Sequence, residues 1–338
     1  MNIALIGLGA VNQGLLEILR DKGESLKAQY GFAPRIVAVA TRTRGCLVAP
    51  DGMDPAWLLA AQDLRSEGAA RGCETGWDAL RIARAAPADV VVEATPTDLT
   101  SAQPALDHCR AAIAGGKHLV LANKGPIALA YDELRQAAAR ANVLLRFEAT
   151  VMAGTPSLRL GMQALAGCTI RSARGILNGT TNYMLTQMEN GVPYNAVLAE
   201  AQRLGYAEAD PTADVDGWDA AGKAIILAAA LFNVRLTLDQ MQVTGIRAIS
   251  LQDIEAARAA GERWKLIAEV TPEGGKVAPL RIAMSHPLAG VAGTTNAVTF
   301  NTDLMGDITL IGTGAGRLQT GFGILSDLLD IHRGRMPI

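Results

Sequence analysis

The sequence predicts an α/β fold, with a doubly wound parallel sheet and a second α+β domain. Three observations support this prediction. A glycine-rich turn at Gly7–Gly9 lies between an apolar run and a helical pattern. Apolar, β-branched runs then alternate with helical stretches as far as residue 149, which is typical of parallel strands joined by crossover helices. After Glu148 the alternation stops, and a turn-rich connector over residues 150–157 begins a second region.

The first turn has the features of a dinucleotide-binding site. Residues 2–6 form the predicted strand, and a helical pattern follows. Gly7 allows the tight turn, and Gly9 lets the backbone approach a pyrophosphate, whose charge then lies at the helix N-terminus. Asn12 replaces the third glycine of the Rossmann-type pattern, which affects helix–strand packing more than phosphate binding. The predicted cofactor-binding residues of this turn are Gly7, Leu8, Gly9, Ala10 and Val11.

The end of the second predicted strand indicates which dinucleotide is bound. This strand covers residues 35–41, and the segment Thr41 to Arg44 stands where an NAD-binding protein places Asp or Glu on the ribose. Guanidinium and hydroxyl groups suit a 2′-phosphate instead. Arg42 therefore predicts that NADP is preferred over NAD. The alternative is an exposed basic loop without a cofactor role.

Further strands bring candidate side chains to one edge of the sheet. The expected elements are strands at 89–95, 118–123 and 143–149 and helices at 102–115 and 126–141. Ligands of such sheets bind beyond the carboxyl ends of the strands. Thr95 and Lys124 stand at these ends, and Lys124 precedes a Gly-Pro pair that opens a helix. We expect Lys124 to face the nicotinamide; the alternative is a lysine on the surface.

Composition argues against several classes of protein. A chain of 338 residues suggests two domains, and 49% hydrophobic with 19% charged residues is ordinary for a globular protein. No apolar stretch approaches the ~18 residues of a membrane span. A net charge of −2 gives no reason to expect nucleic acid or a membrane surface as a partner. Four scattered cysteines without metal spacing indicate a reducing compartment, so a cytoplasmic protein is expected.

The segment 205–223 concentrates charge at the start of an apolar helix. It contains five acids and one lysine, directly before the apolar run 224–232. Asp219 and Lys223 would share one helix face, and Asp216 is expected to be the N-cap. A lysine at the root of an apolar helix needs compensation, so the segment predicts a polar pocket for a small zwitterion. The alternative is a solvated helix pair beside a wet acidic loop.

Five longer motifs carry a resemblance to a known family. They are ANKGP, EATVMAGTP, GILNGTTNYML, LGYAEADPTADVDGWDAAGK and GTGAG, in this order. Together with the glycine turn the motifs run from Gly7 to Asp327, so the match covers nearly the whole chain. The chain resembles homoserine dehydrogenases. The resemblance implies NAD(P)H-dependent interconversion of L-aspartate 4-semialdehyde and L-homoserine, in threonine and methionine biosynthesis. It also implies a small-molecule substrate and a homodimer formed by the catalytic domain.

The resemblance assigns roles to individual residues. It implies that Lys223 gives a proton to the nascent alkoxide and that Lys124 lies close to the nicotinamide and the substrate. Gly314 would belong to a glycine segment that returns to the cofactor. The implied substrate-binding residues are Gly205, Glu208, Asp214, Asp219 and Thr181. The implied ligands of a monovalent cation (sodium or potassium) are Glu148 and the backbone carbonyls of Val151, Ala153 and Thr155.

The resemblance also implies domain limits. Residues 1–135 and 312–338 would form the dinucleotide-binding domain, completed by a C-terminal helix over 315–333. Residues 136–311 would form the substrate-binding, catalytic and dimerisation domain, with several strands in 263–311. The chain leaves no room for the regulatory domain that some relatives append, so feedback control through such a domain is not expected.

Some positions depart from the family pattern, and other functions stay open at this point. Thr313 and Leu318-Gln319 stand where prolines are common, and Met152 where a small residue is common. Aspartate-semialdehyde dehydrogenase handles the same aldehyde but requires an activated cysteine, and no cysteine here lies in such a motif. A reductase of another amino or oxo acid and a non-catalytic dinucleotide sensor are further alternatives, although a sensor has no need of a proton donor at Lys223.

Overall fold

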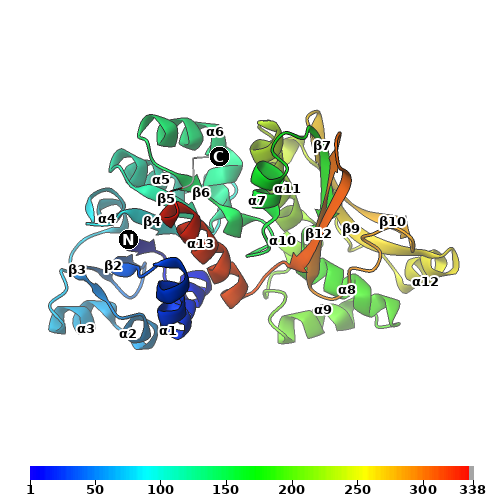
Figure 1. Ribbon diagram of the computed structural model, residues 1–338. Coiled ribbons are helices and arrows are strands. Elements are labelled where there is room, and N and C mark those ends of the chain that lie inside the picture. Colours follow the sequence, from blue (N-terminus) through cyan, green and yellow to red (C-terminus); the bar gives the residue numbers. More distant parts are fainter. Residues whose placement is uncertain (335–338) are drawn as a thin grey trace. The chain divides into compact units, whose positions relative to one another are not determined.

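The computed structural model describes residues 1–334 as two compact units. The first contains Met1–Gly154 and the segment from Gly316 onward, and the second contains Thr155–Ala315 (Figure 1). The predicted division after residue 135 lies within the first unit, because β6 (Leu145–Arg146) pairs with a strand of the first sheet. The last four residues of the predicted segment 312–338 lie outside the described residues.

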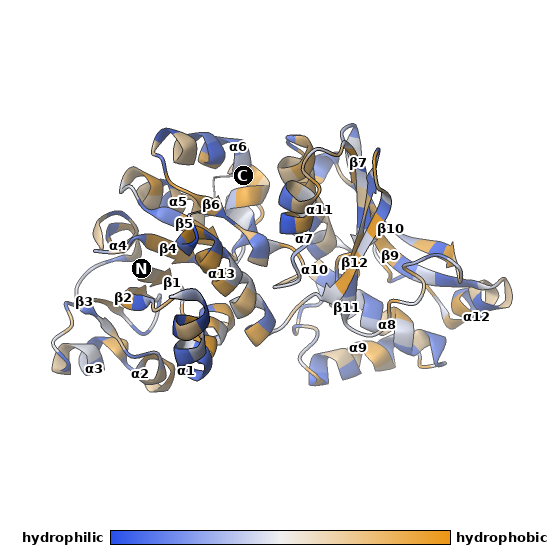
Figure 2. Cartoon of the chain, in the orientation of Figure 1, coloured by the Kyte–Doolittle hydropathy of each residue, from blue (hydrophilic) through white to orange (hydrophobic). Residues whose placement is uncertain are grey.

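The first unit contains the predicted doubly wound sheet. Its strand order is β3-β2-β1-β4-β5-β6, and all neighbours are parallel except β3, which is antiparallel to β2. The strands are β1 (Asn2–Ile6), β2 (Arg35–Ala40), β3 (Cys46–Met53), β4 (Val90–Glu93), β5 (His118–Leu121) and β6. Figure 2 shows hydrophobic residues along the central strands, as expected for strands covered on both faces. The order reverses between β1 and β4, so ligands are expected at the carboxyl ends of these strands.

Helices cover this sheet, and the last one returns from the end of the chain. They are α1 (Ala10–Tyr30), α2 (Pro55–Ala60), α3 (Leu64–Ala70), α4 (Ala79–Ala85), α5 (Ala105–Ala114), α6 (Lys124–Arg140), η1 (Glu148–Thr150) and α13 (Arg317–His332). α13 packs against α1 (Figure 1). Glycines permit this approach: a Cβ at Gly14 would lie 2.1 Å from the Arg317 carbonyl oxygen, and one at Gly321 would lie 2.5 Å from the Leu15 nitrogen. Leu328 of α13 then shares the apolar core with Leu15.

The second unit is the predicted α+β region. Its strand order is β12-β11-β7-β9-β10-β8, and neighbours are antiparallel except β8 and β10. The strands are β7 (Ile170–Ile176), β8 (Gln242–Val243), β9 (Glu262–Thr271), β10 (Gly274–Ala283), β11 (Thr295–Thr302) and β12 (Gly306–Thr313). The mixed fold class predicted from the sequence is therefore confirmed.

The helices of the second unit position the polar segments of interest. They are α7 (Ser157–Arg159), η2 (Leu160–Ala164), α8 (Gly179–Glu189), α9 (Tyr194–Arg203), α10 (Thr212–Val215), α11 (Trp218–Phe232), η3 (Leu238–Gln240) and α12 (Leu251–Ala259). α11 packs on β9 and β10, and α8 packs on β9 and β11. Residues 220–229 of α11 are all buried. Burying the alanine, isoleucine and leucine side chains is favourable, and the cost of burying the Lys223 ammonium is reduced by its hydrogen bonds, which are described below.

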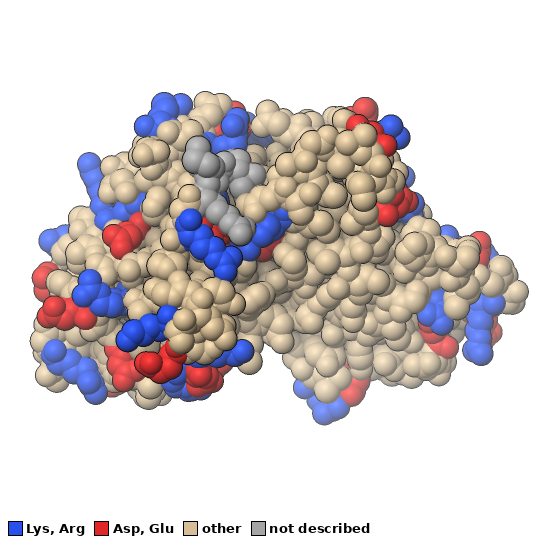
Figure 3. Space-filling view, in the orientation of Figure 1, with Lys and Arg blue, Asp and Glu red and all other residues tan. Residues whose placement is uncertain are grey.

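The surface and the helices carry two further observations. Within residues 1–334, each helix is too short or too polar to cross a membrane. On the face drawn in Figure 3, basic and acidic side chains are interspersed, and the middle of the second unit carries few of either. Interspersed charges of this kind produce no large field of one sign.

Candidate functional site

Lys223 lies inside the apolar helix α11 and is almost completely buried. The residue is 8% exposed, and its Nζ donates hydrogen bonds to the Asp219 carboxylate at 2.7 Å and to the Leu177 carbonyl at 2.6 Å. The predicted pairing with Asp219 is therefore present. It is not the solvated surface pair of the alternative interpretation, since an ammonium this deeply buried depends on such partners.

The start of α11 differs from the prediction. Gly217 is the N-cap, with φ 89°, and Trp218 is the first helical residue. Asp216 instead ends the short helix α10, and its carboxylate pairs with Arg247. The expectation that Asp216 caps α11 is therefore wrong, because Gly217 takes the left-handed conformation that suits glycine. Asp219 remains in the first turn, where the helix dipole favours a carboxylate.

Asn178 connects the two carboxylates nearest to Lys223. Its Nδ2 donates to Asp214 Oδ1 at 2.7 Å and to Asp219 Oδ2 at 3.0 Å. Its Oδ1 accepts from the Thr181 N–H at 2.8 Å and so caps α8. Thr181 is fully buried, and its hydroxyl donates to Asn178, so its side chain supports the cap. In the sequence, Asn178 stood out only as part of the motif GILNGTTNYML.

Asp214 is an acid with a perturbed pKa. Burial raises the pKa of its carboxyl above the usual value, and the charges of Asp219 and Glu208 raise it further. The hydrogen bond from Asn178 and the charge of Lys223 oppose this shift. Asp214, Asp219 and Lys223 therefore form one cluster of interacting charges. Acids with shifted pKa values are common in functional sites.

Gly205 and Glu208 lie on the exposed loop between α9 and α10. Gly205 has φ 75°, which suits a glycine at this turn. The Thr180 hydroxyl donates to the Tyr206 carbonyl and fixes the loop to the start of α8. The Glu208 side chain is exposed, yet close enough to Asp214 to raise its pKa. The loop therefore adds a solvent-facing acid to the cluster.

The glycine turn of the first unit is shaped to accept a phosphate. Gly7 has φ 83°, and a Cβ there would lie 2.7 Å from the Ala94 carbonyl oxygen. Gly9 is the N-cap of α1, no side chain caps this helix, and a Cβ on Gly9 would meet no atom within 4 Å. There is thus free space beside Gly9, at the helix end where the first-turn N–H groups of Ala10 and Val11 have no partner within the helix. This arrangement fits a pyrophosphate.

Asn12, the departure from the glycine pattern, has a structural role. It is fully buried, and its Nδ2 donates to the Gly7 carbonyl at 2.6 Å. This bond holds the turn, and Gly14 provides the close helix packing two residues later. The phosphate-binding part of the motif is therefore intact.

The loop after β2 contacts the glycine turn through Arg44, which the sequence had not indicated as a site residue. Arg44 donates through Nη2 to the Leu8 carbonyl at 2.9 Å and through Nη1 to the Ala61 carbonyl at 3.2 Å. Arg42, the predicted NADP determinant, is exposed on the same loop. Arg44 thus fixes the loop that carries Arg42.

Thr95 and Lys124 lie at the carboxyl ends of β4 and β5, as predicted. The Thr95 N–H donates to the Glu93 carboxylate at 3.2 Å, and Asn123 Nδ2 donates to the Thr95 carbonyl at 3.1 Å. Lys124 is half-buried at the start of α6, and its N–H donates to the Thr97 hydroxyl at 3.3 Å. Glu93, which is fully buried, was not predicted as a site residue. Its position in the apolar run 89–95 could have indicated it, because a buried acid needs partners.

Three of the four predicted cation ligands, Glu148, Val151 and Ala153, lie on a strained segment of the first unit. Glu148 is 4% exposed, and its N–H donates to the Asp327 carboxylate at 2.9 Å. Met152 and Ala153 are left-handed, with φ 56° and 53°, which is uncommon for residues with side chains. Among residues 1–334, no group of three or more His, Cys, Asp or Glu side chains is arranged to hold a metal ion. A site here would consist of one carboxylate and main-chain oxygens.

Thr155 and Gly314 belong to the second unit. Thr155 Oγ1 donates to the Thr313 carbonyl at 2.9 Å. Gly314 packs on the fully buried Asn296, because a Cβ on Gly314 would lie 2.0 Å from the Asn296 Cγ. Only glycine permits this approach, so the glycine segment is fixed against β11.

Three of the four cysteines lack the environment that activates a thiol. Burial raises the pKa of the Cys46, Cys73 and Cys109 thiols above the usual value, whereas a catalytic thiolate requires a lowered pKa. The alternative that needs a reactive cysteine therefore has no support at these three positions.

Family models match both parts of the chain. The model described as "Homoserine dehydrogenase, NAD binding domain" matches residues 7–148, and the model described as "Homoserine dehydrogenase" matches residues 156–329. An NAD(+)-dependent homoserine dehydrogenase from Pseudomonas canavaninivorans is 42% identical, with 98% of this chain and 96% of the relative covered. A homoserine dehydrogenase from Methanocaldococcus jannaschii is 38% identical, with 98% of each covered.

Solved structures are similar over the same length. A putative homoserine dehydrogenase from Archaeoglobus fulgidus has a TM-score of 0.87 at 37% identity, covering 98% of this chain and 99% of that one. A hyperthermophilic archaeal homoserine dehydrogenase in complex with NADPH has a TM-score of 0.81 at 27% identity, covering 99% of this chain and 98% of that one.

Proposed function

Since the chain belongs to the homoserine dehydrogenase family and is an oxidoreductase of this family, we propose that Lys223 is its proton donor. Reduction of L-aspartate 4-semialdehyde to L-homoserine leaves negative charge on the former aldehyde oxygen, and a nearby cation stabilises it. Of the three N–H donors of Lys223, two bind Asp219 and the Leu177 carbonyl. The third can donate to the substrate oxygen. This buried, oriented ammonium is the observation that carries the proposal.

Recognition of the substrate's ammonium falls to the acids around Lys223. Asp214, Asp219 and Glu208 supply three carboxylates beside one lysine, so the cluster has an excess of negative charge. A cationic group is attracted to such a cluster, and aldehydes without an amino group are not. Gly205 would contribute backbone contacts on the same loop. Thr181 would act through Asn178, since its hydroxyl is already bonded there.

The cofactor is proposed to bind at the glycine turn. Gly7, Leu8, Gly9, Ala10 and Val11 would hold the pyrophosphate, and the nicotinamide would supply or accept the hydride when bound. Thr95 and Lys124 would face the nicotinamide end, with Gly314 on the glycine segment that returns to the cofactor.

The loop after β2 supports a preference for NADP. It carries Arg42 and no acid, so it suits a 2′-phosphate better than free ribose hydroxyls. The relative from Pseudomonas canavaninivorans is described as NAD(+)-dependent, and the archaeal structure holds NADPH. A direct comparison of both cofactors on this chain is therefore required.

A monovalent cation, sodium or potassium, is proposed on the segment that follows Glu148. The buried carboxylate and the left-handed residues Met152 and Ala153 give an oxygen-rich loop that suits a hard cation. Glu148 and the carbonyls of Val151, Ala153 and Thr155 would hold it, and its role would be to fix this loop. Replacing sodium and potassium by tetramethylammonium should then lower activity or thermal stability.

Homodimer formation is proposed through the second unit. Leu304, Met305 and Ile311 are 71%, 61% and 53% exposed on the β11–β12 hairpin, which is unusual for large apolar side chains. Figure 2 colours parts of β12 as hydrophobic, and Figure 3 shows few charges over the middle of this unit.

A role in threonine and methionine biosynthesis in the cytoplasm fits this substrate and the four unpaired cysteines.

The experiment that tests the proposal follows reduced cofactor with homoserine and with aspartate semialdehyde, using NAD(H) and NADP(H) separately. Asp219→Asn and Glu208→Gln should each raise KM for homoserine about tenfold or more, because each removes a charge that attracts the ammonium. Asp210→Asn is the matched control, since this exposed loop acid bonds to Thr212 and has no proposed substrate contact. If both variants match the wild type in KM, the assignment of the ammonium site is wrong.

A further inference from the structure

Lys265 is a fully buried lysine of the second unit that has no part in the proposed reaction. It belongs to β9, and its Nζ donates hydrogen bonds to the Val291 carbonyl at 2.7 Å and to Asn182 Oδ1 at 3.2 Å. Both acceptors are neutral, and burial lowers the pKa of the Lys265 ammonium to about 8. A buried ammonium bonded to neutral groups is costly, which indicates that these two hydrogen bonds have a specific role.

Asn182, on α8, is the centre of a hydrogen-bond network between this helix and the chain that leads into β11. Its side chain is buried, and its Nδ2 donates at 3.3, 3.0 and 3.1 Å to the carbonyls of Val291, Gly293 and Thr295. Thr186, one turn further along α8, accepts from the Gly293 N–H at 3.1 Å and donates to the Asn182 carbonyl at 2.7 Å. The lysine of β9 completes the network, because it bonds to the helix and to the chain before β11 at once.

This network lies next to the start of α8, where the candidate site begins. Asn178, the N-cap, is one turn before Asn182, and the Asn182 N–H donates to the Asn178 carbonyl at 3.3 Å. A Cβ on Gly179, the first helical residue, would lie 2.8 Å from the Thr294 carbonyl oxygen, so the chain before β11 also contacts this turn. A shift of Asn182 is therefore transmitted to Asn178, whose side chain donates to both carboxylates beside Lys223.

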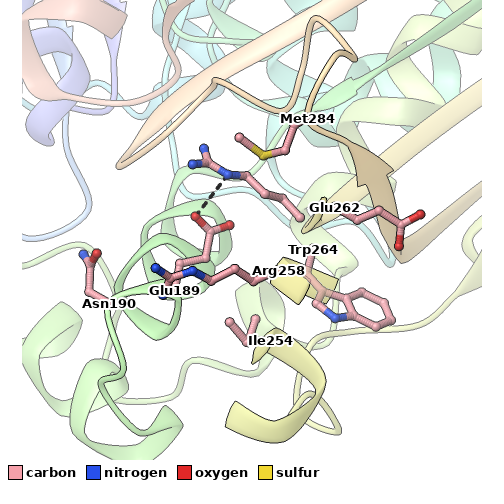
Figure 4. Close-up of a pocket in the computed structure, with 8 residues that line it drawn as sticks. Glu189, Asn190, Ile254, Arg258, Glu262, Trp264 and Met284 are labelled. Atoms are coloured by element: carbon pink, nitrogen blue, oxygen red, sulfur yellow. Dashed lines mark ion pairs between the residues drawn. The ribbon is translucent and has the colours of Figure 1, made fainter. Parts of the chain in front are cut away.

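The other end of α8 is connected to the same strand more weakly. Arg263 precedes Lys265 by two residues and so points to the same side of β9. Its Nε lies 3.5 Å from Oε2 of Glu189, the last residue of α8, and the dashed line in Figure 4 marks this ion pair. The pair is partly exposed to solvent, and such pairs contribute little. The position of α8 on β9 thus depends mainly on the buried bonds of Lys265.

We propose that Lys265 is a positioning residue for the substrate site: through Asn182 it keeps Asn178 where it holds Asp214 and Asp219. This inference rests on the proposed function, in which these two acids attract the substrate's ammonium. Lys265 acts through α8 and does not itself contact the substrate. The alternative is that Lys265 only satisfies buried carbonyl groups and stabilises the fold.

The test measures kcat and KM for homoserine oxidation, together with thermal unfolding, in Lys265→Met. Methionine fills a similar volume without an N–H donor, so the change removes mainly the two hydrogen bonds. KM for homoserine should rise about tenfold, because the two acids lose their common partner. We expect kcat to fall less than about threefold, since α11, which carries Lys223, packs directly on β9 and β10. KM for the cofactor should stay within about twofold, because the glycine turn belongs to the first unit.

Two further variants separate positioning from general loss of stability. Val270→Ala removes buried apolar packing from the same strand and leaves the network intact, so it should lower Tm and keep KM for homoserine within about twofold of the wild type. Asn182→Ala removes the partner of Lys265. The double variant of Lys265→Met with Asn182→Ala should have a KM within about twofold of the more impaired single variant, because both changes break one network.

The proposal is overturned if Lys265→Met lowers Tm but leaves KM for homoserine unchanged, or if Val270→Ala raises this KM as much. If neither buried variant folds, Thr186→Val decides, because it preserves the shape of a half-buried side chain and removes its bond to Gly293. This variant should raise KM about threefold, and an unchanged KM overturns the proposal. Asp219→Asn is measured beside them. An unchanged KM in Asp219→Asn refutes the ammonium site itself, whereas an unchanged KM in the network variants alone refutes only the role of Lys265.

Discussion

Replacing Asp214 by asparagine should stabilise the protein at neutral pH while weakening its activity. Asn keeps an oxygen that can accept the Asn178 hydrogen bond, so the substitution removes mainly the charge. Activity should fall, since Asp214 belongs to the proposed ammonium site. Stability should rise, because the carboxylate is buried beside another acid.

The magnitude follows from the geometry at Asn178. Its Nδ2 lies 2.7 Å from Asp214 Oδ1 and 3.0 Å from Asp219 Oδ2, so these oxygens are at most about 5.7 Å apart. Two like charges at that distance repel by about 3 kcal/mol at an effective dielectric constant of about 20. Lys223 offsets part of this repulsion. We therefore expect Asp214→Asn to raise the free energy of unfolding by about 1 kcal/mol at neutral pH.

The pH dependence provides the stricter assay. The pKa of Asp214 is raised in the folded protein, so the folded state binds a proton more readily than the unfolded chain. Asp214 therefore contributes most to the stability of the wild type below the ordinary pKa of an aspartate, about 3.9. This contribution is lost as the pH rises through the pKa of Asp214 in the folded protein. The variant lacks this loss. Its advantage in urea unfolding should be full near about pH 7 and shrink toward about pH 4.

Two results would refute this reasoning. One is a lower free energy of unfolding for Asp214→Asn at neutral pH, and the other is an advantage that does not change with pH. Asp210→Asn is the matched control, because hydrogen bonds from Thr212 lower the pKa of Asp210. This control should show no gain at neutral pH.

The remaining predictions concern packing, cofactor choice and assembly. Gly14→Ala should lower the free energy of unfolding by about 2 kcal/mol or more, because the added Cβ would meet the Arg317 carbonyl. Gly23 lies in the same helix, α1, but a Cβ there would meet no atom. Gly23→Ala should therefore raise the free energy of unfolding by about 0.5–1 kcal/mol, measured by urea unfolding. Arg42→Ala should lower kcat/KM with NADPH about tenfold and leave NADH within about twofold; an unchanged NADP preference removes Arg42 from the cofactor site. Ile311→Glu should give monomers by light scattering, and an intact dimer would place the interface elsewhere.

Much of the first sheet could be predicted because local patterns determine it. The glycine turn, the apolar strand before it and the helix after it are all encoded within the first thirty residues. β3 was missed because it contains Pro50 and Gly52, which normally indicate a turn. An edge strand tolerates both, since one side of its backbone needs no partner strand.

The site was predictable only where its contacts are local. Asp219 and Lys223 are four residues apart, so helix geometry alone brings them together. Asn178 is 36 residues before Asp214 and 41 residues before Asp219 in the sequence, and no spacing rule connects positions so far apart. For Asp216 a local rule gave the wrong prediction. The capping pattern predicted an N-cap, but Gly217 takes that position and Asp216 pairs with the distant Arg247. The functional roles of all these residues stay predictions.

The most direct test of the central claim is the rate of aspartate semialdehyde reduction by Lys223→Met, measured beside its affinity for NADPH. We predict that kcat falls at least about 100-fold, because the proton donor is removed, while Kd for NADPH stays within about twofold. A kcat within about threefold of the wild type, in a folded variant, would contradict the assignment of Lys223 as the acid.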